Sequence, residues 1–426
     1  MRNYKRALGL AFAVLSGFSL FAQTTLSPYT RYGYGNLYES SFGPSSAMGG
    51  VIYGIRSNGQ INPGNPASYS TTDSTTFLFD VGVFVQNGSF YQTNDNGIGG
   101  TREHKTTGNF EYAAMQFPIM KNMGASIGIM PFSSVGYRFG TKQDIAGGVE
   151  NIYEGTGGLS EVYAGLAYKF FNRVSLGVNA GYLFGTITHT GGSYFNNSQV
   201  DNSYITNSFN IKAIKTDIGL QYSQPVGKDI LTIGAVYTPR ISPRSRIEGY
   251  KTTTGSGGTS IDTVQIDQST NKFTLPQSFG FGASYKIKNK WLIAADYTYQ
   301  DWKDAKYFGE TNQLNRRQKI AGGVEFLPST DSRAFFRKLK YRLGGYYSDS
   351  YLRTNTGSGL NEFGLSAGVG IPIKNSYMET TGSMINVSFE YINKRPTVGS
   401  LIKEDYFRVT LNMTFNELWF FKRKLD

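Results

Sequence analysis

Short segments in which apolar and polar residues alternate are the feature that most constrains how this chain folds. The last of them places Phe407, Val409, Leu411, Met413 and Phe415 on one face and Arg408, Thr410, Asn412 and Thr414 on the other. Because successive side chains of a β-strand point to opposite faces, each segment predicts a strand with one apolar and one polar face. Fourteen such segments follow one another, at residues 76–87, 109–118, 124–137, 159–170, 174–186, 208–223, 230–244, 273–287, 290–302, 318–327, 340–348, 363–373, 383–393 and 406–415.

A membrane-spanning β-barrel accounts for this pattern together with the composition. Aromatic residues make up 15% of the chain and 52 residues are glycine, yet the mean hydropathy is only −0.32. A barrel in a membrane gives such values, because only every second strand residue faces lipid. Beyond residue 22 no apolar run reaches the roughly 18 residues that a spanning helix needs. We therefore predict an all-β transmembrane antiparallel barrel of about 14 strands, with a soluble β-sandwich as the alternative.

The connections between the predicted strands alternate in length. Those at residues 171–173 and 288–289 are tight, whereas those at 88–105 and 248–271 are long and polar. Bacterial outer-membrane barrels place short turns in the periplasm and long loops outside the cell. This predicts a protein of the outer membrane with both termini in the periplasm, and a soluble sandwich has no reason to alternate its loops in this way.

The two ends of the chain differ from the predicted barrel at 75–416. Residues 1–22 have the form of a secretory signal peptide, with Arg2, Lys5 and Arg6 before the apolar run 7–18 and Ala22 as the cleavage point. Residues 417–426 form a basic tail. Cysteine is absent, which excludes disulfides, thiolate metal sites and a lipoprotein anchor.

Residues 23–74 do not read as strands. Glycines and prolines interrupt them throughout, and they show little sustained alternation. A segment of this kind before a barrel is either a disordered tail or a plug inside the lumen. Its apolar and aromatic side chains, including Tyr29, Tyr34, Met48 and Tyr53, favour a plug, or hatch, over disorder.

Charge and catalytic residue types give little support for other functions. The net charge is +12, but the basic residues are scattered, so we expect no nucleic acid as a partner and assign the excess to anionic lipid headgroups of the outer membrane. The only histidines, His104 and His189, fall in predicted exterior loops, and neither belongs to a recognisable triad. We predict no enzymatic activity, no cofactor and no metal site.

Two motifs in the glycine-rich segment point to a known family. Residues 47–50 read Ala-Met-Gly-Gly, and Asn65, Pro66 and Ala67 stand just before the first predicted strand. With these motifs the chain resembles the FadL/TodX outer-membrane transporters, whose N-terminal hatch carries a small-Gly-Gly stretch and ends in Asn-Pro-Ala. Residues 275–282 are similar to the family's proline-containing strand entry, whereas the aromatic and basic tail looks more like barrels of the Bacteroidota.

The resemblance implies passive uptake of hydrophobic or amphiphilic small molecules, with an exit through the side of the barrel. Pro131 lies in the middle of a predicted strand and cannot donate to its ladder, so a lateral opening or a harmless bulge is expected there. Candidate lumen-lining residues are Asp80, Asp217, Asp296 and Glu390. The alternative function is that of a barrel subunit in a larger envelope machine for protein secretion or outer-membrane protein assembly, with other envelope proteins as partners.

Overall fold

The computed structural model describes residues 27–93, 99–143, 149–195, 200–255, 260–329, 334–354, 357, 359–373, 382–397 and 401–418. The predicted signal peptide and all but residues 417–418 of the predicted tail lie outside this part of the chain. No helix among the described residues is long and apolar enough to cross a membrane.

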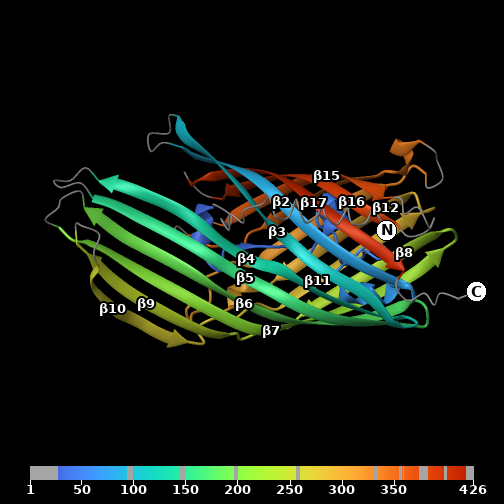
Figure 1. Cartoon of the computed structure of the whole chain (residues 1–426), viewed down its shortest axis with the longest axis horizontal. Helices are drawn as coiled ribbons and strands as arrows, with labels where there is room; N and C mark the ends of the chain where they lie inside the picture. Colours follow the sequence, from blue (N-terminus) through green and yellow to red (C-terminus); the bar gives the residue numbers. More distant parts are fainter. Residues whose placement is uncertain are drawn as a thin grey trace, which may run out of the picture.

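Fourteen antiparallel strands form a closed barrel, as the alternation predicts (Figure 1). Each strand pairs with its neighbour around the ring, and the ring closes where β17 pairs with β2. The barrel strands are β2 (Thr76–Thr93), β3 (Gly100–Met120), β4 (Met123–Gln143), β5 (Val149–Phe170), β6 (Val174–Phe195), β7 (Asn202–Val226), β8 (Asp229–Thr238), β11 (Ser278–Ile287), β12 (Trp291–Gln300), β13 (Arg317–Phe326), β14 (Lys340–Asp349), β15 (Leu360–Ile373), β16 (Ser383–Pro396) and β17 (Lys403–Leu418).

The tight connections of three residues each contain two successive residues with positive φ. Phe171 and Asn172 between β5 and β6 both have positive φ, as do Lys288 and Asn289 between β11 and β12. Two successive residues with positive φ match the twist of the flanking strands. We call the end of the barrel with these connections the turn end, and the opposite end the loop end.

The outer surface of the barrel is apolar in a continuous band. On β17, 43% of Leu411 is exposed, whereas its neighbour Asn412 is 1% exposed and points inward. The same alternation exposes Leu176 and Val178 on β6. A band of outward apolar side chains around a closed barrel is the surface that hydrocarbon chains of lipid cover.

At the loop end the sheet continues well past this band. Two segments predicted as loops, 88–105 and 248–271, consist mainly of strand, because β2, β3, β9 (Arg244–Thr254) and β10 (Ser260–Thr270) extend into them. The hairpin of β9 and β10 pairs with the loop-end half of β7 and lies at the left of Figure 1. The predicted strand 230–244 is wrong at its end, because Pro239 and Pro243, which cannot donate to a ladder, separate β8 from β9.

The N-terminal segment, residues 27–75, lies inside the barrel. It contains 3₁₀ helices η1 (Pro28–Arg31), η2 (Gly43–Met48) and η3 (Pro66–Thr71) and the two-residue strand β1 (Asn36–Leu37). Wall glycines let it approach closely: a Cβ on Gly344 of β14 would lie 2.1 Å from the carbonyl carbon of Met48. The interior of the barrel is therefore a packed core of wall and segment side chains, including Tyr34, Phe42, Tyr69, Tyr112 and Trp302.

The remaining 3₁₀ helices lie in the connections of the wall. Helix η4 (Trp302–Asp304) follows β12 at the loop end, and η5 (Phe335–Lys338) precedes β14 at the turn end.

Candidate functional site

The wall of the barrel is interrupted between β3 and β4. These strands pair from Met120↔Met123 only as far as Ala113↔Ile129. Past that point β3 continues along β2, and β4 continues along β5, with no further pairing of β3 with β4. We call this interruption the seam. Ile127 and Ile129 face outward on the turn-end side of the seam. The seam therefore begins at the edge of the apolar band that is nearer the loop end.

Pro131 marks the start of the seam on β4. The pairing of β4 with β5 shifts register between Pro131 and Ser133, and Gly157 on the facing part of β5 has φ +106°. A Cβ at Gly157 would lie 2.1 Å from the carbonyl oxygen of Thr186, so a side chain would be excluded by sterics as well as by φ. The sequence left open whether Pro131 makes a lateral opening or a bulge. In the structure both the seam and a bulge occur at Pro131.

The N-terminal segment occupies the free edge of β4 at the seam. Strand β1 pairs Asn36 with Ser134 and Leu37 with Ser133, and the N–H of Tyr38 donates to the carbonyl oxygen of Phe132 at 3.0 Å. These bonds satisfy backbone groups that β3 leaves unpaired, which is necessary at membrane depth. Only two residue pairs are involved, so the contact is small compared with a barrel strand pair.

Two internal cavities of about 120 Å³ each adjoin this contact. Both are lined by Leu37, Tyr38 and Glu39 from the segment and by Met130 and Pro131 from β4. Residues 37–39 thus border both cavities next to the seam, and we call them the partition.

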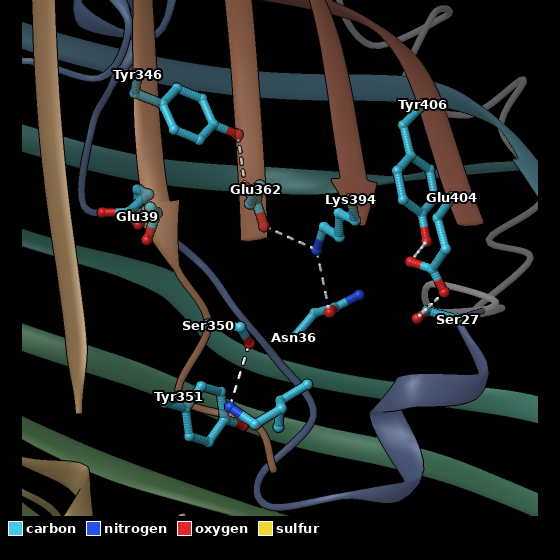
Figure 2. Close-up of polar contacts among 12 residues, drawn as sticks. Ser27, Asn36, Glu39, Tyr346, Ser350, Tyr351, Glu362, Lys394, Glu404 and Tyr406 are labelled. Atoms are coloured by element: carbon cyan, nitrogen blue, oxygen red, sulfur yellow. Dashed lines mark hydrogen bonds and ion pairs between the residues drawn. The ribbon is translucent and has the colours of Figure 1, made fainter. Parts of the chain in front are cut away.

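The first cavity is lined by charged groups from the segment and from β13 to β17. Figure 2 shows Tyr346 donating to Glu362 (2.6 Å) and Lys394 bridging Glu362 (3.1 Å) and Asn36 of β1 (3.4 Å). A charge in the interior is stable only when its partners are in place. Lys394 therefore links the position of β1 to the barrel wall.

Two more wall contacts hold the segment, and Figure 2 shows one of them. Glu404 accepts a hydrogen bond from Ser27 at 2.6 Å and another from Tyr406 at 2.7 Å. Glu39 of the segment forms ion pairs with Arg317 and Lys319 of β13. Burial raises the pKa of Glu39, but the two cations outweigh it and lower this pKa to about 2, so Glu39 is ionised at neutral pH.

The hatch motif predicted from the sequence holds the segment to the wall. Asn65 is fully buried, and its Oδ1 accepts from the N–H of Ala67 (3.2 Å) at the start of η3. Its Nδ2 donates to the carbonyl oxygens of Tyr53 (2.8 Å) and of Leu220 on β7 (3.3 Å). Pro66 packs against the wall glycine Gly177.

The four predicted lumen residues all lie inside the barrel but have different surroundings. Asp217 and Glu390 line cavities, and Asp217 forms an ion pair with Lys215 at 2.7 Å. Asp80 accepts from Tyr112 and other wall side chains. Asp296 accepts from two backbone N–H groups of the segment.

Several residues at this site were not predicted from the sequence. Glu39, Lys319, Glu362, Lys394 and Arg408 belong to no motif. Lys319 and Arg408 lie on predicted strands, Glu362 and Lys394 lie one residue beyond the predicted strands 363–373 and 383–393, and Glu39 lies in the predicted hatch. His104 and His189 were expected in loops, but they lie on β3 and β6, because these strands extend past the apolar band. Among the described residues no three His, Cys, Asp or Glu side chains form a group that could hold a metal ion.

A family model described as BamG matches residues 5–426. The fold is shared with solved structures at low sequence identity. A structure titled CymD monoaromatic hydrocarbon channel matches with a TM-score of 0.59 and 13% identity, over 90% of this chain and 100% of that one. The Pseudomonas putida toluene transporter TodX matches with a TM-score of 0.59 and 12% identity, over 91% and 100% of the two chains. A Pseudomonas aeruginosa FadL homologue matches with a TM-score of 0.55 and 12% identity, over 90% and 99%. No curated protein matches the chain.

Proposed function

The chain belongs to the BamG family and has the fold of the FadL/TodX-type outer-membrane transporters, and from this premise we propose that it carries hydrophobic or amphiphilic small molecules passively across the outer membrane. In this proposal residues 23–74 are a hatch, the loop end faces the exterior and both termini are periplasmic. The observation that carries the proposal is the seam between β3 and β4, which only a short piece of the hatch covers.

The seam supplies a route into the membrane that avoids the polar turn end. A solute in the lumen beside Pro131 lies next to the loop-end edge of the apolar band. Movement through the seam therefore takes it directly into lipid. An apolar cavity of roughly 150 Å³ holds one benzene molecule. Each cavity here measures about 120 Å³, and residues 37–39 border both of them. Passage therefore requires the partition at residues 37–39 to move, which joins the cavities and uncovers the seam.

A reversible cross-link between β1 and β4 tests this route. Leu37 and Ser133 are direct partners across an antiparallel pair, where Cα atoms lie roughly 4.5–5.5 Å apart, within the range that a disulfide spans. The chain has no cysteine of its own, so Leu37→Cys with Ser133→Cys gives one defined bond. We expect the oxidised protein to lose uptake of toluene by cells and the reduced protein to regain it.

The matched control places the same bond where it leaves the partition free. Ile127 and Ala164 are partners between β4 and β5 on the outer face, and their double cysteine variant should take up toluene equally in both redox states. Heat-modifiable gel mobility checks that every variant is folded. Uptake that is unchanged by the Leu37–Ser133 disulfide would contradict an exit through the seam.

The second candidate is a barrel subunit of a larger envelope machine for protein secretion or outer-membrane protein assembly. The filled lumen favours it, because both internal cavities are small and the lining of the first includes many charged side chains beside its apolar ones. Membership of the BamG family is compatible with this candidate, because the description of that family does not name a hydrocarbon channel. This candidate predicts no toluene uptake in either redox state and stoichiometric co-purification with other envelope proteins.

A further inference from the structure

A cup of about 1,110 Å³ lies at the loop end, separate from the seam and the internal cavities. Its wall comes from β4 to β7 and β9, which rise past the apolar band, and from the connections that precede β13 and β15. Its floor is formed by η1 and the residues that follow it, Tyr32 and Gly33. The volume is slightly above the range of about 300–1,000 Å³ that is usual for small-molecule sites, which leaves room for a chain of several sugar-sized units.

The charged side chains that line the cup are all positive among the described residues. Arg31, Lys251 and Arg353 line it, whereas no Asp or Glu does so among the described residues. None of the three cations forms an ion pair with a carboxylate in the described part of the chain. The guanidinium of Arg31 lies 4.6 Å from the ring centre of Tyr153, which orients it without neutralising it. A concave site with one sign of charge concentrates its field and attracts an anion.

The uncharged part of the cup combines amides with aromatic faces. Asn151, Asn207 and Gln313 line it, and so does Phe308, which is 43% exposed and is held by edge contacts with Phe209 at 5.1 Å. These amides both donate and accept hydrogen bonds, which is the chemistry that recognises hydroxyl groups.

One polar atom in the cup lacks a partner. The Nδ1 of His189 lies 2.8 Å from the hydroxyl oxygen of Tyr137, which fixes the ring. Its Nε2 is shielded from solvent and has no hydrogen-bond partner within the described residues. Because Nε2 is shielded, it does not face the contents of the cup, and the His189 ring contributes to the wall through its contact with Tyr137.

We propose that the cup binds an acidic saccharide, a sugar chain that carries carboxylate or phosphate groups. The three cations take the acidic groups, the amides take hydroxyls, and the aromatic faces pack against the apolar faces of the sugar rings. A hydrocarbon does not fit this site, because it would desolvate the cations without replacing their hydrogen bonds. This inference concerns a different ligand and a different place from the proposed transport, and it does not depend on it.

Binding of trigalacturonate to the purified protein in detergent tests the proposal. Isothermal titration should give saturable binding that weakens as salt is raised, because ion pairs at an open site are screened. Galactotriose has comparable rings without the carboxylates, and it should bind at least about tenfold more weakly. Inorganic phosphate should compete poorly, because it has no rings for the aromatic faces.

A pair of variants assigns the binding to the cup. Lys251 and Arg353 are exposed, so Lys251→Gln with Arg353→Gln should leave the barrel folded and weaken trigalacturonate binding about tenfold or more. Lys228→Gln with Lys290→Gln removes the same charge at the turn end and should leave binding unchanged. The proposal is overturned by absence of saturable binding, by equal binding of galactotriose, by full competition from phosphate at the same concentration, or by equal losses in the two double variants.

Discussion

Replacement of Asp296 by alanine tests how firmly the wall holds the N-terminal segment. The Oδ2 atom of Asp296 on β12 accepts hydrogen bonds from the backbone N–H groups of Ile52 (2.5 Å) and Tyr53 (2.9 Å). All three residues are buried, so Asp296→Ala leaves two buried backbone donors without their acceptor.

The size of the effect follows from these two bonds. A buried donor that loses its partner costs about 1–3 kcal/mol, so the pair costs about 2–6 kcal/mol. The removed side chain leaves polar space that water can enter, so we expect the lower end, about 2 kcal/mol. Because 1.4 kcal/mol is a factor of ten in an equilibrium constant, this part of the segment should open about 30 times more often.

Amide hydrogen exchange at Ile52 and Tyr53 measures that opening. Thr298→Val is the matched control, because Thr298 lies two residues away on the same strand and its hydroxyl lies 2.9 Å from the hydroxyl of Tyr53, without contacting the two N–H groups. It should speed exchange by roughly fivefold, the loss of one ordinary hydrogen bond worth about 1 kcal/mol. Unchanged exchange at both amides in Asp296→Ala, or faster exchange spread over the barrel strands, would refute the reasoning.

Further predictions concern topology and the two faces of the wall. Lys251→Cys should react with a membrane-impermeant maleimide on intact cells and Lys288→Cys should not, because they lie at the loop end and the turn end; the reverse result would place the termini outside. Leu411→Arg should cost about 2–4 kcal/mol when folding is measured in lipid vesicles, and no measurable cost would mean that this face does not meet lipid. Asn412→Arg should also destabilise the barrel, in detergent as well as in lipid, because Asn412 is buried and its amide donates to Asp80 and Tyr112.

The last expectation shows where alternation alone misleads. From the sequence, Asn412 is a polar residue on an inward face, and a water-filled lumen would accept a larger polar side chain there. In the structure η2 fills this part of the lumen, and a Cβ on Gly43 would lie 2.5 Å from Oδ1 of Asn412. Local pattern gives the direction in which a side chain points, but not what lies opposite it.

For the site, too, the sequence predicted local features but not the partners of each side chain. Proline at 131 signalled a missing donor, and Asn65 signalled a local cap, because both effects act within a few residues of the chain. The partners of Glu39 on β13 could not be predicted, since Arg317 and Lys319 follow it by more than 270 residues and only closure of the barrel brings them together. The same holds for Lys394, whose contact with Asn36 depends on where the segment folds back.

By itself the sequence determined the number of barrel strands, their facing and the positions of the tight turns. The physical reason is that a lipid-facing surface requires an apolar side chain at every second position. This alternation can be recognised within the sequence of each single strand. Only the tertiary structure decided that β9 and β10 extend the sheet, that β3 and β4 part at Ile129, and that β1 covers the gap. Those features depend on hydrogen bonds between segments that are far apart in the chain. The backbone groups of a free strand edge pair with the segment that lies beside them in the folded protein, and the local sequence does not show which segment that is.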